Sequence, residues 1–309
     1  MKKYFKLVGL LSLGIIFFEA CKPVTPLPTA SITSVVVNNV VTFNLITTNS
    51  SAYKWSFGDG DTAIVYSTAA VIHAYPKDGT TYSVSLLVLG PGGEKTASAT
   101  VTIPTMTQMD KLTGGTSFKN GKAWRISASN GITLAAPDSV MTVKDNFQAG
   151  ILTNLQLGLA YTDQFIFSVG GNLALNNLGG GALSGLSYCT ANKITNIPPQ
   201  LTDSLALTYA TPYTPPAGLT FLLNTGKNLT IVASSDGVKN TAVTYKNVNT
   251  LSFSANGFFG IRDFMSECVV LQMAPTLMKV AFFVSDISPL SPQLGKITKV
   301  LIVTFETVP

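Results

Sequence analysis

The chain has 309 residues, enough for two domains of ordinary size, and a formal net charge of +5. Only 11% of the residues are charged, against about 25% in typical soluble proteins, yet 46% are hydrophobic, which excludes a disordered chain. Lysine and arginine form no basic stripe with interleaved aromatic residues, so nucleic-acid binding is excluded as well.

The first 20 residues have the form of a secretion signal. Three positive charges open the segment: Lys2, Lys3 and Lys6. The apolar run that follows at 7–18 is too short to span a bilayer, which takes about 20 residues. The small residue Ala20 directly before Cys21 resembles the cleavage site of bacterial lipoproteins. This resemblance implies cleavage before Cys21 and acylation of that cysteine, and the alternative is an ordinary signal peptide with a coincidental cysteine.

Residues 21–28 are predicted to be a tether. They contain three prolines, which favour an extended and semi-rigid chain: Pro23, Pro26 and Pro28. Lys22 follows the cysteine, whereas an Asp there tends to retain Gram-negative lipoproteins in the inner membrane. The resemblance therefore implies a lipid anchor in the outer membrane. We expect the protein to face the cell surface, with the periplasmic face as the alternative left open.

Residues 29–104 read as a series of short strands separated by turn signals rich in Gly, Asn and Pro. Hydrophobic alternation predicts strands at 32–37, 40–46, 53–57, 69–74, 81–88 and 95–103. Strands of this length and spacing predict a β-sandwich.

Residues 53–61 are the most distinctive stretch of this domain. Tyr53, Trp55 and Phe57 alternate with polar residues, so they share one face of a strand that ends in a Gly-Asp turn. Together with His73-Ala74-Tyr75, Gly79 and the segment 82–86, this stretch resembles the PKD domain, an immunoglobulin-like module of extracellular proteins. The resemblance implies a spacer or adhesive module beside a second, functional domain.

The polar residues of this stretch have two interpretations. His73, the only histidine in the sequence, is either a metal ligand or general base, or a structural residue of the PKD pattern. Asp59 and Asp61 have a spacing that suits Ca²⁺, or they belong to the turn. Two carboxylates are few for a calcium site, so we expect structural roles, and no metal or cofactor.

Residues 105–309 are predicted to form a second, larger β-sandwich of jelly-roll type. A short helix at 106–112 is expected to end at Gly114-Gly115. Alternation then predicts strands at 121–126, 139–143, 150–157, 164–168, 205–209, 219–223, 229–232, 243–248, 250–253, 268–273, 279–284 and 298–305.

Short motifs in this domain resemble a group of Bacteroidetes surface lipoproteins that place a PKD module before a sandwich domain. The motifs are Leu112-Thr113-Gly114, Lys122-Ala123-Trp124, Gly257-Phe258-Phe259-Gly260 and the strand that starts at Cys268. The resemblance implies a role in capturing or degrading polysaccharide.

The second domain offers little for catalysis. It contains two glutamates, Glu267 and Glu306, and no histidine, so Ser-His and Cys-His catalysis within it are excluded. A glycosidase usually needs two carboxylates facing each other across a cleft. The closest pair, Asp263 and Glu267, is interpreted as two solvated turn residues. We therefore expect no enzymatic activity.

Exposed aromatic rings are the expected means of binding a sugar. Trp124 is interpreted as a core residue, which leaves tyrosines as the candidate glycan-binding residues: Tyr209, Tyr213, Tyr161 and Tyr188. The alternative for each is an ordinary half-buried tyrosine of a β-sheet.

Two cysteines remain if Cys21 carries lipid. An oxidising compartment would permit a disulfide between Cys189 and Cys268, and the alternative is two buried thiols.

The sequence thus predicts an all-β protein. Its segments are a lipoprotein signal (1–20), a tether (21–28), a PKD domain (29–104) and a C-terminal sandwich (105–309). The leading functional hypothesis is non-catalytic recognition of an extracellular polysaccharide by a membrane-anchored protein. The alternatives are an adhesive protein that binds a protein partner in the envelope and, with less support, a glycosidase-like protein.

Overall fold

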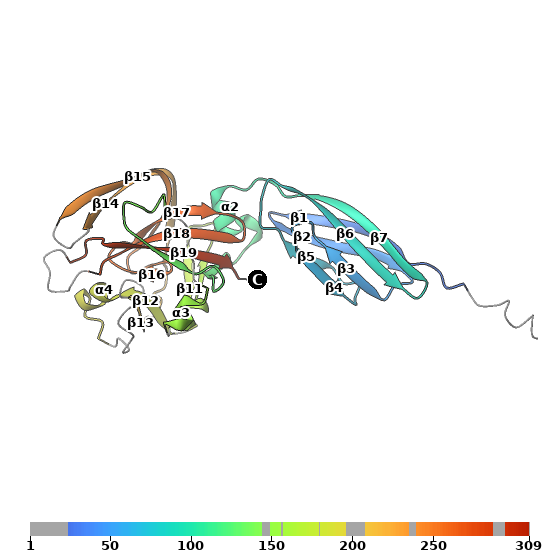
Figure 1. Cartoon of the computed structure of the whole chain (residues 1–309), viewed down its shortest axis with the longest axis horizontal. Helices are drawn as coiled ribbons and strands as arrows, with labels where there is room; N and C mark the ends of the chain where they lie inside the picture. The colour runs from blue at the N-terminus through green and yellow to red at the C-terminus, as the bar shows by residue number, and fades with distance from the viewer. Residues whose placement is uncertain are drawn as a thin grey trace, which may run out of the picture. The chain divides into compact units, whose positions relative to one another are not determined.

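The computed structural model describes residues 24–143, 149–155, 157–178, 180–195, 208–234, 239–286 and 294–308. The chain divides into two compact units (Figure 1). The first unit consists of Met1–Val36, Val41–His73 and Thr81–Thr102. The second unit consists of Val37–Val40, Ala74–Thr80 and Ile103–Pro309. Within the described ranges, every helix is too short or too polar to cross a membrane.

The strands before Ile103 form two sheets, one of three strands and one of four. One sheet has the order β1 (Thr29–Val37), β2 (Val40–Thr48), β5 (Val71–Ala74). The other has the order β4 (Thr62–Val65), β3 (Ala52–Ser56), β6 (Thr81–Gly90), β7 (Gly93–Thr102). The predicted β-sandwich is confirmed, with β4 as a strand that the alternation pattern did not reveal.

The core between these two sheets is aromatic. Trp55 on β3 is 1% exposed, and its ring centroid lies 5.4 Å from that of Phe43 on β2. Gly58 follows this strand with φ +87°, and a Cβ at this position would collide with the Ser83 carbonyl oxygen of β6. Only glycine therefore allows the turn to approach the neighbouring strand.

The second unit is built on a large antiparallel sheet. Its strand order is β11 (Leu173–Asn176), β10 (Gln164–Phe167), β8 (Lys122–Ile126), β19 (Lys299–Thr307), β18 (Leu277–Val284), β17 (Glu267–Met273), β15 (Asn240–Phe253), β14 (Phe221–Ser234). A further strand, β9 (Ile132–Ala135), pairs with β19. Figure 1 shows β17, β18 and β19 side by side. This order is that of a large meandering sheet and does not show the expected jelly roll.

The central strands of this sheet are buried on both faces. On β19, Leu301 and Val303 belong to the core of one face, and Val300 and Ile302 belong to the core of the other. A strand buried on both sides reads as a continuous apolar run, which explains why this was the strongest strand signal in the sequence.

The long β14–β15 hairpin covers the second face. Its register shifts between Asn224 and Leu229, and its outer half supplies Ile231 and Tyr245 to the core there. Ala233 near its end forms a parallel bridge to Ile297. The predicted strands at 243–248 and 250–253 are thus parts of one bent strand.

The first face is covered by a smaller sheet and short helices. The sheet has the order β13 (Thr208–Pro212), β12 (Gly181–Gly185), β16 (Ile261–Arg262), and β12 leads into helix α4 (Leu186–Ala191). The strand predicted at 150–157 is wrong, because helix α3 (Ile151–Asn154) occupies its start. The strand predicted at 139–143 is also wrong, because these residues form hydrogen-bonded turns.

Lys122 and Trp124 cap the end of helix α2 (Gln108–Thr113). Gly114 ends the helix with φ +79°, as the glycine pair predicted. Trp124 Nε1 donates to the Leu112 carbonyl oxygen at 2.8 Å, and Lys122 Nζ donates to that of Lys111 at 2.8 Å. These carbonyls have no partner within the helix, and a cation is favoured at this end of the helix dipole. The Leu-x-Gly and Lys-x-Trp motifs therefore have a structural role.

Candidate functional site

Two of the predicted tyrosines converge on one arginine of the small sheet. The Arg262 guanidinium carbon lies 4.9 Å from the ring centroid of Tyr213 and 5.5 Å from that of Tyr188. Its Nε donates to Ser184 Oγ at 3.1 Å, and its Nη2 donates to Thr211 Oγ1 at 3.1 Å. We call these five residues the Arg262 cluster.

The strand register places these side chains on one face. Ser184 on the central strand β12 lies opposite Tyr209 on β13 and opposite Arg262 on β16. Directly opposed residues share a face of a sheet, and Thr211 follows Tyr209 at the two-residue spacing of one face. Ser184 and Thr211 are fully buried, and their hydroxyl oxygens lie 2.9 Å apart. Both hydroxyl groups are therefore held in place as hydrogen-bond acceptors for the guanidinium.

Neighbouring groups hold the two rings in place. Tyr213 donates through its hydroxyl to the Asn256 carbonyl oxygen at 2.8 Å, and Phe258 packs edge-on against its ring at 5.0 Å. Tyr188 packs edge-on against Phe264 at 5.6 Å. Both tyrosines are half-buried, so each ring is oriented while part of it stays accessible.

The segment before β16 anchors the arginine. Phe259 is 1% exposed and stacks on Phe305 with ring centroids 4.0 Å apart. Gly260 follows with φ +66°, and a Cβ there would collide with the rings of Phe282 and Phe305. This Gly-Phe-Phe-Gly motif therefore fixes where β16, and with it Arg262, leaves the core.

The electrostatics of the cluster are dominated by the guanidinium. In the described ranges, no carboxylate lies within salt-bridge distance of Arg262. Burial raises the pKa of Tyr213, and the positive charge of Arg262 opposes that shift. The site thus presents a cation between two aromatic rings, with hydroxyl groups behind it.

Asp263, the next residue, is buried beneath this site. It is 8% exposed, and its Oδ1 accepts hydrogen bonds from Phe264 N at 2.8 Å and Ser285 N at 3.3 Å. Among the described residues, its Oδ2 has no hydrogen-bond partner, and burial raises the pKa of the carboxyl to about 7. Gly185 makes space for this oxygen, since a Cβ there would collide with it. The interpretation of Asp263 as a solvated turn residue is wrong, because the packing of β12 and β16 encloses it.

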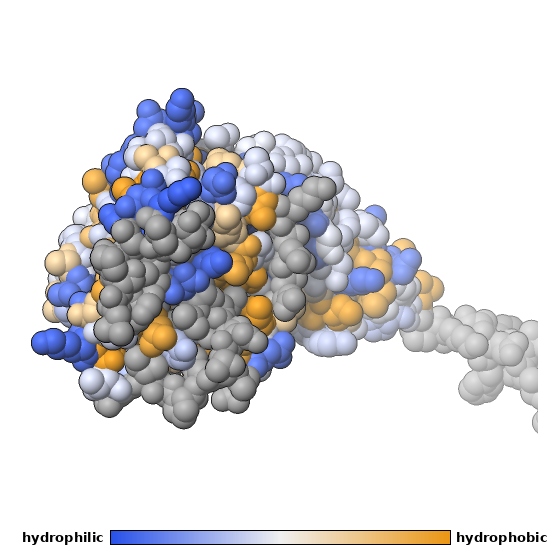
Figure 2. Space-filling view, turned by 60° about the vertical axis from the view of Figure 1, so that its left-hand side comes forward, coloured by the Kyte–Doolittle hydropathy of each residue, from blue (hydrophilic) through white to orange (hydrophobic). Residues whose placement is uncertain are grey.

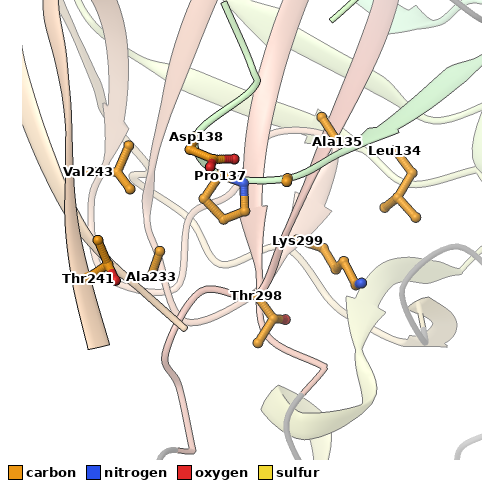
Figure 3. A pocket seen from close by; sticks show the side chains of 10 residues that line it. Leu134, Ala135, Pro137, Asp138, Ala233, Thr241, Val243, Thr298 and Lys299 are labelled. Atoms are coloured by element: carbon orange, nitrogen blue, oxygen red, sulfur yellow. The ribbon is translucent and has the colours of Figure 1, made fainter. Parts of the chain in front are cut away.

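A second candidate is a hollow of about 470 Å³ where the β14–β15 hairpin meets β9 and β19 (Figure 3). The side chains of Asp138 and Lys299 lie on different sides of it. Its remaining lining is mainly small or apolar, as with Ala135, Pro137 and Val243, and includes no aromatic ring. Because sugar binding relies on aromatic faces, the Arg262 cluster is the stronger candidate for a glycan.

The first unit contains a cluster of Asp59, Asp61 and His73. Their potential ligand atoms lie within 4.8 Å of one another. His73 Nε2 lies 2.6 Å from Asp59 Oδ2, and the imidazole stacks on Phe57 with ring centroids 4.1 Å apart. Asp59 Oδ1 also accepts a hydrogen bond from Asp61 N at 3.1 Å, as in a tight turn. These contacts favour the structural interpretation of all three residues.

The family model of the PKD domain matches residues 28–103. This part of the chain is a PKD domain. The PKD1 domain of Vibrio anguillarum Epp is 22% identical, over 26% of this chain and 99% of that one, with a TM-score of 0.24. The PKD1 domain of the Vibrio cholerae metalloprotease PrtV is 28% identical, over 26% of this chain and 100% of that domain, with a TM-score of 0.24. No curated protein matches the chain.

PKD domains are commonly found in extracellular proteins. Each end of the matched segment lies one residue away from the corresponding end of the predicted PKD domain, 29–104. The PKD domain is followed by the further β-rich region that carries the Arg262 cluster.

The other two predicted tyrosines lie outside the Arg262 cluster. Tyr161 packs against the core of the first face, and its hydroxyl accepts a hydrogen bond from Leu152 N at 3.1 Å. Tyr209 shares the face of Ser184 but is separated from Arg262 by the width of β12. Tyr161 therefore has a structural contact, and Tyr209 lies at the border of the site.

Arg262, Ser184 and Thr211 were missed by sequence reasoning. Ser184 and Thr211 resemble any other hydroxyl residue of a strand. Arg262 carried a usable signal, because it is one of only two arginines in the chain and lies two residues after the end of the Gly-Phe-Phe-Gly motif.

The candidate disulfide is not formed in this structure. Cys189 and Cys268 are both free and buried. Cys189 lies on α4 near the Arg262 cluster, whereas Cys268 lies on β17 and donates to the Leu251 carbonyl oxygen at 3.6 Å. Burial raises the pKa of both thiols, so neither is activated as a nucleophile.

Proposed function

We propose that this protein is an exported, lipid-anchored binder of extracellular polysaccharide, with the Arg262 cluster as its binding site and the PKD domain as a spacer. The observation that carries the proposal is the convergence of Tyr188 and Tyr213 on Arg262. Aromatic faces bind the apolar faces of sugar rings, and the guanidinium supplies planar hydrogen-bond donors for hydroxyl groups.

The state of the two glutamates supports a non-catalytic role. Glu267 lies 2.6 Å from Lys227 Nζ and also accepts a hydrogen bond from Thr250. Glu306 lies 2.8 Å from Arg125 Nη2 and accepts one from Ser127. A glycosidase needs two carboxylates free to face the substrate, whereas these are engaged with other side chains.

An adhesive role would call for a broad apolar surface. On the face drawn in Figure 2, apolar residues lie singly or in small groups among hydrophilic ones. The drawn face therefore gives no support to an adhesive role.

Removing either ring is expected to weaken polysaccharide binding. The mature chain, residues 21–309 with Cys21→Ala, would be screened against immobilised plant and microbial polysaccharides. Tyr188→Ala and Tyr213→Ala should each raise the Kd at least tenfold, since loss of a well-packed aromatic contact costs about 2 kcal/mol. Tyr213→Phe should retain most of the affinity because it keeps the ring.

The matched control for this screen is Tyr66→Ala, which removes a tyrosine that is 79% exposed in the PKD domain. This variant should bind like the parent chain. Equal binding by all variants would place the site elsewhere, with the hollow beside Asp138 and Lys299 next to test. Absence of binding to every polysaccharide would refute the proposed function and direct the search to protein partners.

Cys21→Ala in the full-length chain is expected to abolish membrane attachment. Cys21 lies outside the described residues, so this prediction rests on the sequence. A single lipid chain gives only marginal binding, and the two-site acylation expected at Cys21 gives a stable anchor. Fractionation of cells after labelling with palmitate should find the parent protein labelled in the membrane and the variant unlabelled and soluble. Protease treatment of intact cells would then distinguish the cell surface from the periplasmic face.

A further inference from the structure

We propose that the sugar bound at the Arg262 cluster is acidic and places a carboxylate or sulfate group on the Arg262 guanidinium. This inference rests on the proposed function and adds the chemical class of the ligand. It starts from the two arginines of the chain, which lie in contrasting environments.

Arg125 is neutralised within the protein, whereas Arg262 is not. Arg125 Nη2 lies 2.8 Å from Glu306 Oε1, and its Nε donates to the same oxygen at 2.9 Å. For Arg262, the partners in the described part of the chain are two neutral hydroxyls and two rings. A half-buried positive charge without a counter-ion is costly, and a bound anion would relieve that cost.

The carboxylate next in sequence does not serve as the counter-ion. Asp263 directs Oδ1 to the backbone N–H groups of Phe264 and Ser285, and it forms no salt bridge with Arg262. The fold thus keeps the Asp263 carboxylate buried in the core, and within the described ranges the Arg262 guanidinium has no carboxylate as a salt-bridge partner.

The guanidinium also has the donor chemistry that an oxyanion needs. It has five N–H donors in one plane, and the bonds to Ser184 and Thr211 use one on Nε and one on Nη2. Among the described residues, no acceptor is bonded to Nη1, and planar N–H pairs match carboxylate and sulfate oxygens. The rings of Tyr188 and Tyr213 would then contact the sugar ring that carries the anion.

Polymers of the same backbone with and without charge test this proposal. The carboxylate pair is polygalacturonate and its methyl ester, and the sulfate pair is carrageenan and chemically desulfated carrageenan. The mature chain, residues 21–309 with Cys21→Ala, should bind the charged member of one pair at least tenfold more tightly than the neutral member in 150 mM salt. The pair that shows the preference identifies the anion.

Arg262→Gln should abolish that preference. The control is Lys246→Gln, which removes one exposed positive charge from β15, outside the cluster, and should leave the preference intact. Arg262→Lys keeps the charge without the planar donors and should reduce the preference severalfold. If circular dichroism shows that Arg262→Gln fails to fold, the test rests on Arg262→Lys, whose preference for the charged polymer should be severalfold smaller than that of the parent chain.

Three results would overturn the inference. Equal affinity for charged and neutral polymers would do so while leaving the proposed function standing. A preference that Arg262→Gln and Lys246→Gln reduce equally would indicate nonspecific attraction to a basic surface. Absence of binding to every polymer would overturn both the inference and the proposed function.

Discussion

Replacing Lys122 with methionine is expected to lower the free energy of unfolding of the second unit by about 3 kcal/mol. Two carbonyl oxygens lose their hydrogen-bond donor in this variant, and each loss costs about 1–3 kcal/mol. Lys122 is 5% exposed, and its Nζ donates to the carbonyls of Lys111 and Pro275 and lies 4.8 Å from the centre of the Trp124 ring. Methionine keeps the apolar stem and removes the donors.

The charge state of Lys122 does not change this expectation. Burial lowers its pKa to about 7, while the two carbonyls and the ring face favour the ammonium form. The neutral amine also donates hydrogen bonds, so either form caps helix α2.

The two tryptophans make the measurement specific. Trp55 lies in the PKD domain and Trp124 in the second unit, so a Trp55→Phe background leaves fluorescence that reports on the second unit alone. Urea unfolding would compare Lys122→Met with Lys246→Met, which alters an exposed lysine and should change stability by less than about 0.5 kcal/mol. Similar losses of unfolding free energy in the two variants would show that the hydrogen bonds of Lys122 to the end of helix α2 do not stabilise the second unit.

Replacing Asp263 with asparagine is expected to stabilise the protein at pH 8 and to have little effect near pH 4. Burial raises the folded-state pKa of Asp263 to about 7 from the ordinary value of 3.8 for an aspartate. Between these values the folded state holds a proton that the unfolded state has released. The favourable contribution of the neutral carboxyl is therefore complete below pH 4 and is lost as pH rises through about 7.

The size of this effect follows from the pKa difference. A change from 3.8 to about 7 corresponds to roughly 4 kcal/mol as an upper bound. Asparagine retains an oxygen that accepts from Phe264 N and Ser285 N, and it carries no charge at any pH.

Urea unfolding of parent and Asp263→Asn at pH 4.5, 6 and 8 would test this expectation. The stability difference should grow with pH and level off near pH 8. Glu94→Gln, which alters an exposed carboxylate of the PKD domain, should show a small and nearly constant difference. A constant difference for Asp263→Asn as well would mean that its carboxyl titrates normally.

Sequence periodicity predicted a strand well where each side of that strand keeps the same environment, buried or solvent-exposed, along its length. The alternation of Tyr53, Trp55 and Phe57 predicted strand β3, since its two sides face a core and solvent. The apolar run ending at Phe305 predicted β19, which is buried on both sides. The signal failed at Ile151–Asn154, where a short apolar stretch fits a helix and a strand equally well and packing selected the helix.

The candidate site was predicted only in part. Tyr188 and Tyr213 were chosen as candidates because sugar binding needs aromatic rings and Trp124 was interpreted as a core residue. Arg262 was missed because a single charged residue at a strand end is normally a solvated side chain. Its contacts with Ser184, Tyr188 and Tyr213 form only when β16 pairs with β12.

The sequence by itself determined the local features of this protein: the PKD pattern at 28–103, the helix that ends at Gly114 and the strongest strands. These depend on residues close together in the chain. Only the tertiary structure decided that Arg262 lies between Tyr188 and Tyr213, that Asp263 is buried and that Lys122 caps helix α2. Each of these depends on how separate strands and helices pack against one another, and no local sequence pattern encodes which segments will meet.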